Sequence, residues 1–87
     1  MRETDHCAHL RGQIRKLEEF LLQLRRKFWL EYPESRFRKR VEAGEDFTEL
    51  KTFPPGSEGV NIRGIAAIQR TLKNTREMYE ADCIKPL

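Results

Sequence analysis

The feature that most constrains this sequence is a run of apolar residues near its N-terminus with alternating spacings of three and four. The run consists of Cys7, Leu10, Ile14, Leu17, Leu21, Leu24 and Phe28. This spacing lines up side chains on one helix face, as in a coiled coil or helical hairpin. It predicts a long amphipathic helix over about 3–31. Pro33 pushes Tyr32 out of helical geometry, so the helix should stop near residue 31.

A second run with the same spacing lies near the C-terminus. It consists of Ile65, Ile68, Leu72, Thr75 and Tyr79. With Asn61 as a good N-cap and Pro86 as a stop, this run predicts another long helix over about 61–83. The two seams, from Cys7 to Phe28 and from Ile62 to Cys83, are equally long, about 32 Å at 1.5 Å per residue. Equal lengths suit pairing.

The residues between the two seams predict a short helical segment. Pro33 can occupy the first turn of a helix over about 34–43, and Gly44 can cap its end in a left-handed conformation. Phe37 and Val41, which are four residues apart, would form its inward face.

The following stretch, 44–60, predicts a loop with one helical turn. Asp46 and Glu49 fit a capping box with an Asp cap, which favours a turn of helix carrying Phe47 and Leu50. The prolines and glycines in 54–59 predict a loop.

These elements predict an all-α fold, a helical hairpin of two long helices with a short helical middle, in a single three-helix, bundle-like domain over 1–87. The middle segment is broken into pieces too short to span 32 Å, so we expect the long helices to be antiparallel. Phe28 would then meet Ile62, and Cys7 would approach Cys83. A middle helix running the full length would instead make them parallel and separate the cysteines.

Charge and hydropathy limit the functional classes. Charged residues make up 36% of the chain, and 17 cationic side chains stand against 14 anionic ones, so the surface is mixed and only weakly basic. Basicity of this degree is weak evidence for nucleic acid. No apolar run is long enough for a membrane span, and the N-terminus does not resemble a signal peptide. We expect a soluble, intracellular protein, in a compartment that the sequence does not identify.

The two cysteines form no CxxC pair. Reduced, partly buried thiols are the expected state, and a Cys7–Cys83 disulfide across the open end of the hairpin is the alternative. His6 and His9 lie beside Cys7, but adjacent ligands on a helix diverge, so neither a metal nor another cofactor is predicted.

Catalytic motifs are absent from the sequence. There is no P-loop, HExxH or GxSxG pattern. The neighbouring carboxylates Glu18 and Glu19 would point apart on a helix. These observations predict a chain that is not an enzyme.

The stretch 25–40 is the most suggestive for binding. It interleaves aromatic residues with seven cations: Arg25, Arg26, Lys27, Arg36, Arg38, Lys39 and Arg40. Such a segment could bind an acidic protein, contact the phosphates and bases of RNA or DNA, or simply be a solvated face over buried aromatics.

Leu22 and Trp29 form a second stripe on the first helix, about 100° from its seam, and Phe20 and Leu30 also lie off the seam. Either the middle segment or a partner must cover them. We therefore predict an assembly or adaptor subunit that binds a protein, with self-association a further possibility and nucleic-acid binding the competing hypothesis. Its predicted partner-binding residues are Leu22, Arg25, Arg26, Trp29, Arg36, Arg38, Lys39 and Arg40.

Overall fold

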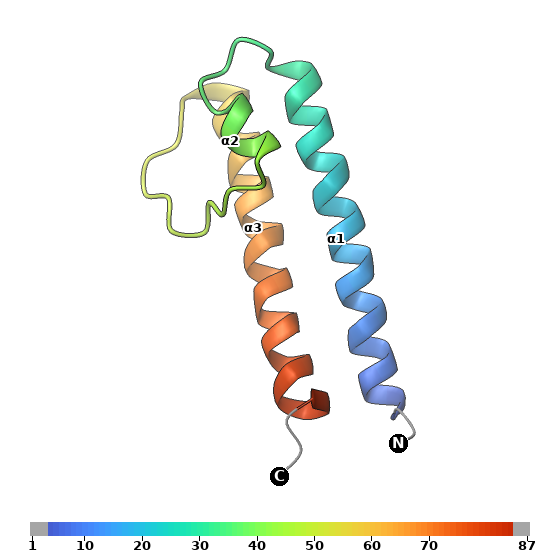
Figure 1. Cartoon of the computed structure of the whole chain (residues 1–87). Coiled ribbons are helices and arrows are strands. Elements are labelled where there is room, and N and C mark those ends of the chain that lie inside the picture. Colours follow the sequence, from blue (N-terminus) through green and yellow to red (C-terminus); the bar gives the residue numbers. More distant parts are fainter. Residues whose placement is uncertain (1–3, 85–87) are drawn as a thin grey trace.

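The computed structural model describes residues 4–84, which form an antiparallel hairpin of two long helices with a short helix beside its closed end (Figure 1). The elements are α1 (Asp5–Glu31), α2 (Arg38–Glu42), α3 (Gly56–Tyr79) and the π-helix η1 (Glu80–Ile84). The hairpin measures 49 × 23 × 18 Å. The predicted all-α hairpin is confirmed. Across residues 4–84, no helix combines the length and the apolar character that a membrane crossing requires.

Both ends of α1 follow local sequence rules. At its start, the Thr4 hydroxyl accepts a hydrogen bond from the Cys7 backbone N–H at 3.1 Å, a typical N-cap interaction. At its end, the Tyr32 N–H donates to the Phe28 carbonyl at 2.9 Å before Pro33 interrupts the helix. The helix therefore ends at Glu31, next to the proline that predicts its stop.

The core lies at the closed end of the hairpin, where the middle segment adds a third layer. Phe28 from α1 and Ile62 from α3 are both fully buried in it, as the antiparallel arrangement requires. Val41 and Phe47 from the middle segment are buried in the same cluster. This third layer gives the apolar seams of α1 and α3 a cover that two helices alone cannot provide.

The open end of the hairpin is built from two helices alone. Cys7 and Leu10 are buried there, whereas Ile14 is only half-buried. Cys7 and Cys83 form a disulfide, with their Cα atoms 6.0 Å apart. The expectation of reduced thiols is therefore wrong, because the antiparallel pairing brings the two residues within bridging distance.

The middle segment contains less helix than its sequence predicts. The predicted helix over 34–43 is limited to α2, because residues 32–38 form tight turns in which the Ser35 hydroxyl accepts a hydrogen bond from the Phe37 N–H at 3.0 Å. Gly44 ends α2 with a φ of 75°, as predicted. The N–H groups of Gly44 and Glu45 donate to the carbonyls of Val41 and Arg40, which is the Schellman arrangement.

The turn of helix predicted over 47–51 is not a helix, so this interpretation is wrong, although the Leu50 N–H donates to the Phe47 carbonyl at 3.1 Å in a single tight turn. The Asp46 carboxylate accepts from the Thr48 N–H at 2.8 Å, which makes a side-chain turn and not a helix cap. Gln69 of α3 holds this segment from outside, because its side chain accepts from Phe47 N–H and donates to Glu45 C=O, both at 2.9 Å. Tertiary hydrogen bonds to α3 therefore hold a single tight turn where a helix was predicted.

The helix α3 begins at Gly56, earlier than the predicted start near Asn61, so the predicted 54–59 loop is wrong from Gly56 onward. Gly56 has a φ of 74°, which turns the chain from Pro55 into the helix. At Gly59, a Cβ atom would lie 1.9 Å from the Pro54 carbonyl oxygen. Gly56 and Gly59, which suggest a loop in the sequence, therefore allow the Pro54 backbone to lie close against the first turn of α3.

At the other end of the same helix, α3 stops at Tyr79 and η1 continues to Ile84, so Cys83 lies in a π-helical turn. The predicted helix over 61–83 does not distinguish these two parts. A π-helix is wider than an α-helix, so side chains beyond Tyr79 point in directions that α-helical spacing does not predict.

We expect Gly59→Ala to destabilise the fold by about 1 to 3 kcal/mol, because its Cβ would overlap a backbone atom. Gly64 is a matched control on the same helix, since a Cβ added there would meet no atom within 4 Å, and Gly64→Ala should stabilise by about 0.5 to 1 kcal/mol. Urea unfolding followed by far-UV circular dichroism measures both changes. Equal effects of the two variants would contradict the close crossing at Gly59.

We also expect reduction of the disulfide to lower the free energy of unfolding by about 4 to 5 kcal/mol, because the bond closes a loop with a sequence separation of 76. Urea unfolding with and without a thiol reductant measures this. A Cys7→Ala/Cys83→Ala variant should lose a similar amount and stop responding to the reductant. A wild-type chain with unchanged stability after complete reduction would refute the expectation.

Candidate partner-binding surface

The outer face of α1 carries apolar side chains that the core does not use. We call Leu22, Arg26, Trp29 and Leu30 the outer stripe, because they share the side of α1 that faces away from its seam. The Leu22 and Leu30 side chains are 54% and 65% exposed, and Trp29 is 37% exposed. The sequence allows either the middle segment or a partner to cover this stripe. The middle segment covers little of it.

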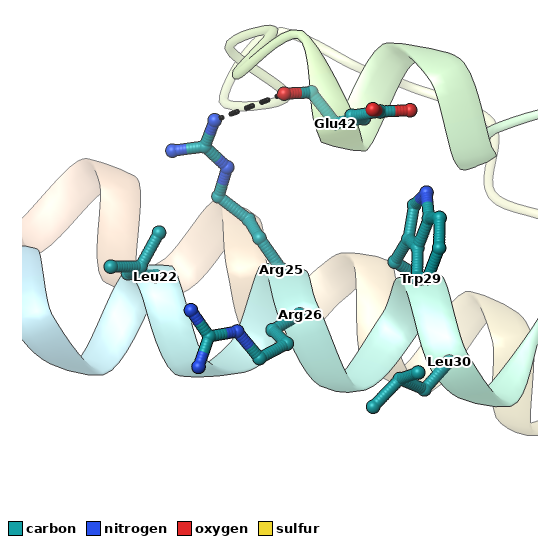
Figure 2. A pocket seen from close by; sticks show the side chains of 6 residues that line it. All are labelled: Leu22, Arg25, Arg26, Trp29, Leu30 and Glu42. Carbon is teal, nitrogen blue, oxygen red and sulfur yellow. Dashed lines mark hydrogen bonds between the residues drawn. The ribbon is translucent and has the colours of Figure 1, made fainter.

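Packing of the middle segment explains this exposure. Val41 and Phe47 point into the core beside Phe28, not toward the outer stripe. α2 therefore lies alongside α1 with a shallow hollow between them, of about 440 Å³ (Figure 2). Its lining consists of Leu22, Arg25, Arg26, Trp29, Leu30 and Glu42.

Arg25 joins the two helices that border the hollow. Its Nε donates to the Val41 carbonyl at 3.1 Å and its Nη2 donates to the Glu42 carbonyl at 3.4 Å, as Figure 2 shows for the second bond. These carbonyls belong to the last turn of α2, where the helix leaves acceptors unsatisfied and its dipole favours a cation. Arg25 therefore fixes α2 against α1.

Arg38 holds the tryptophan of the stripe. Its guanidinium carbon lies 4.0 Å from the centroid of the Trp29 ring, which is a close cation–π contact. The Arg38 Nε is buried and has no hydrogen-bond partner within residues 4–84. Trp29 is thus restrained by one cation while part of its ring stays open to solvent.

Arg40 belongs to a different part of the surface. Its Nε donates to the Glu45 carboxylate at 2.8 Å, and this contact lowers the pKa of Glu45. Its guanidinium also lies over the Phe37 and Phe47 rings, at 5.0 and 5.5 Å. Arg40 lines a second hollow, of about 650 Å³, with Arg36, and this hollow shares no residue with the first.

The structure therefore divides the predicted binding residues. It gathers Leu22, Arg25, Arg26 and Trp29 around one hollow, with Arg38 against Trp29. Arg36 and Arg40 lie at the second hollow. Lys39 is exposed on α2 and lines neither of the two hollows. The stretch 25–40 is continuous in sequence but not in space.

Two residues of the first hollow are missing from the predicted set. Leu30 follows Trp29 and is eight positions from Leu22, so helical spacing could have placed it on the same face. Glu42 carries no comparable signal, because it reaches the hollow only through the packing of α2.

The open end offers no metal centre among the described residues. The Cys7 and Cys83 sulfurs are joined to each other, His6 Nε2 lies 2.9 Å from an Asp82 carboxylate oxygen, and His9 contacts Gln13. Over 4–84, no group of three or more His, Cys, Asp or Glu side chains is placed to hold a metal ion.

The hollow beside the outer stripe combines apolar side chains with cations and one carboxylate. This chemistry suits contacts with another macromolecule, through burial of Leu and Trp side chains and charge pairing at the rim. Comparison of the chain with models of protein families, with curated proteins and with solved structures found no match.

Proposed function

We propose that this chain is a non-enzymatic interaction module, an assembly or adaptor subunit, that binds a protein partner through the outer stripe of α1. The observation that supports this most is the exposure of Leu22, Trp29 and Leu30 around a single hollow. Exposed apolar residues with a polar rim mark interaction sites more often than isolated ones do. Trp and Arg, which both occur here, are over-represented among residues that dominate binding energy.

The positions of the cations favour a protein over a nucleic acid. Arg25 is hydrogen-bonded to α2, Arg38 stacks on Trp29, and Arg40 is paired with Glu45. Phosphate binding needs several cations free to approach one backbone. The other four cations of the stretch form no ion pair within the described chain: Arg26, Lys27, Arg36 and Lys39. They do not share one site, because Arg26 lies at the first hollow and Arg36 at the second. Glu42 lies in the same hollow as Arg26 and would repel phosphate.

We further propose that the module works in an oxidising compartment, in place of the general intracellular location expected from sequence. The Cys7–Cys83 disulfide supports this, because disulfides persist in such compartments and are reduced in the cytosol. Trapping thiols with an alkylating reagent at lysis of the native cells should leave both cysteines unmodified by mass spectrometry. Alkylation of both in most of the protein would reject the proposal.

We expect Trp29→Ala to weaken partner capture by about tenfold or more and to leave far-UV helicity intact, because the ring is exposed and acts as an interface anchor. Pull-down from native cells combined with circular dichroism measures both. Phe20→Ala is the matched control, since Phe20 is an aromatic residue of α1, 47% exposed, that does not line the hollow. Equal losses for the two variants, or loss of helicity in Trp29→Ala, would count against the proposal.

The competing hypothesis makes a different prediction for the same proteins. A nucleic-acid binder should lose affinity as salt rises, with a log-log slope of roughly 0.7 to 0.9 per phosphate contact. Arg26→Ala should then reduce binding more than Trp29→Ala does. Negligible retention of RNA and DNA at low salt would exclude this hypothesis.

A further inference from the structure

The charges around Leu22 on α1 have opposite signs on its two sides. Glu18 and Glu19 precede Leu22, and Arg25 and Arg26 follow it. Glu18 and Arg26 are equally far from Leu22 in sequence, and each is about one turn of helix away. Between residues 18 and 26, the outer face of α1 therefore changes from acidic to apolar to basic, and Arg15 adds a cation one turn before Glu18.

Three neighbouring hollows follow this face. The hollow beside the outer stripe shares Leu22 and Arg25 with a hollow that also contains Glu18 and Glu19. It shares Arg26 and Leu30 with a third one. Together they extend over residues 18–31 of α1, about 20 Å along the helix axis. Shallow hollows spread over this length suit an extended partner such as a helix better than a compact ligand.

We propose that the protein bound at the outer stripe is a second copy of this chain, with the two α1 helices antiparallel and crossing at Leu22. This inference rests on the proposed function, because it names the partner of the same surface. In a two-fold arrangement every contact occurs twice. Glu18 of each copy lies opposite Arg26 of the other, and the two Leu22 side chains meet at the axis.

The same register provides further matching contacts. Arg15 and Trp29 are also equally far from Leu22, so the Arg15 guanidinium of one copy approaches the exposed Trp29 ring of the other. Glu42, on the rim of the hollow near Trp29, can pair with that same Arg15. Within residues 4–84, Arg15, Arg26 and Glu42 take part in no ion pair. Dimer formation therefore breaks no intramolecular ion pair of these three residues.

Other partners match the charge pattern less well. A uniformly acidic helix would meet Glu18 and Glu19, and a uniformly basic one would meet Arg25 and Arg26. A parallel second copy would place like charges opposite each other. The partner must carry both signs in reverse order, and an antiparallel copy of α1 does so.

Charge reversal tests this register. Sedimentation equilibrium at tens of micromolar and low salt should show a wild-type dimer, and Glu18→Lys and Arg26→Glu should each weaken it by about tenfold or more, because each creates two like-charge contacts. The double variant Glu18→Lys/Arg26→Glu should recover the dimer. A mixture of the two single variants should form heterodimers, since both contacts are then restored.

Two controls separate the interface from the fold. Lys51→Glu also reverses an exposed charge, but in the loop before α3 and not on α1, so it should leave the dimer unchanged. Glu18 also contacts Arg76 of α3 at 3.3 Å, so far-UV circular dichroism of each variant checks the helices. Trp29 is the one tryptophan of the chain, and its emission should shift to longer wavelength as the wild-type dimer is diluted.

The outcomes distinguish this inference from the proposed function. A wild-type monomer, or a dimer that resists both reversals, overturns the second-copy proposal. If a monomeric chain still captures another protein in a Trp29-dependent manner, the proposed function stands without the second copy. Weakening by the single reversals without recovery in the double variant or the mixture also overturns the proposed register.

Discussion

The burial of Phe28 between α3 and the middle segment is the interaction on which the rest of the structure depends. A chain of 87 residues buries a limited fraction of its surface, so its stability margin is small. Phe28, Val41 and Ile62 are fully buried together, and they join α1, α2 and α3 at one point. This packing places α2 beside the last turns of α1, which in turn creates the hollow next to Trp29.

The two ends of the hairpin are stabilised in different ways, because two helices alone bury little apolar surface. At the closed end, Val41 and Phe47 add apolar cover, and Gln69 holds their segment with two hydrogen bonds. At the open end no third layer exists among the described residues, and the Cys7–Cys83 bond joins the helices covalently. A disulfide contributes most in a small domain with a limited core, which is the situation of the open end.

Helical spacing predicted the two seams, because they depend on one repeating local pattern. The short pieces of the middle segment predicted the antiparallel pairing, which places Phe28 and Ile62 in the same core. Helical spacing did not predict the features that depend on tertiary contacts. The start of α3 depends on Gly59 passing close to the Pro54 carbonyl, and no local rule contains that contact. In the candidate site, Leu22 and Trp29 were predictable from their offset to the seam. The use of Arg25 as a cap for α2 was not, because its acceptors are far away in sequence.

The exposure of the outer stripe follows from the length of α2. This helix has 5 residues, so it presents little more than one inward side chain, and Val41 occupies that position over Phe28. The same short helix cannot also cover Leu22 and Leu30, which lie on another side of α1. A longer α2 could have closed over the stripe. The turns at 32–38 and the cap at Gly44 prevent that extension, and the apolar side chains on this face of α1 stay exposed.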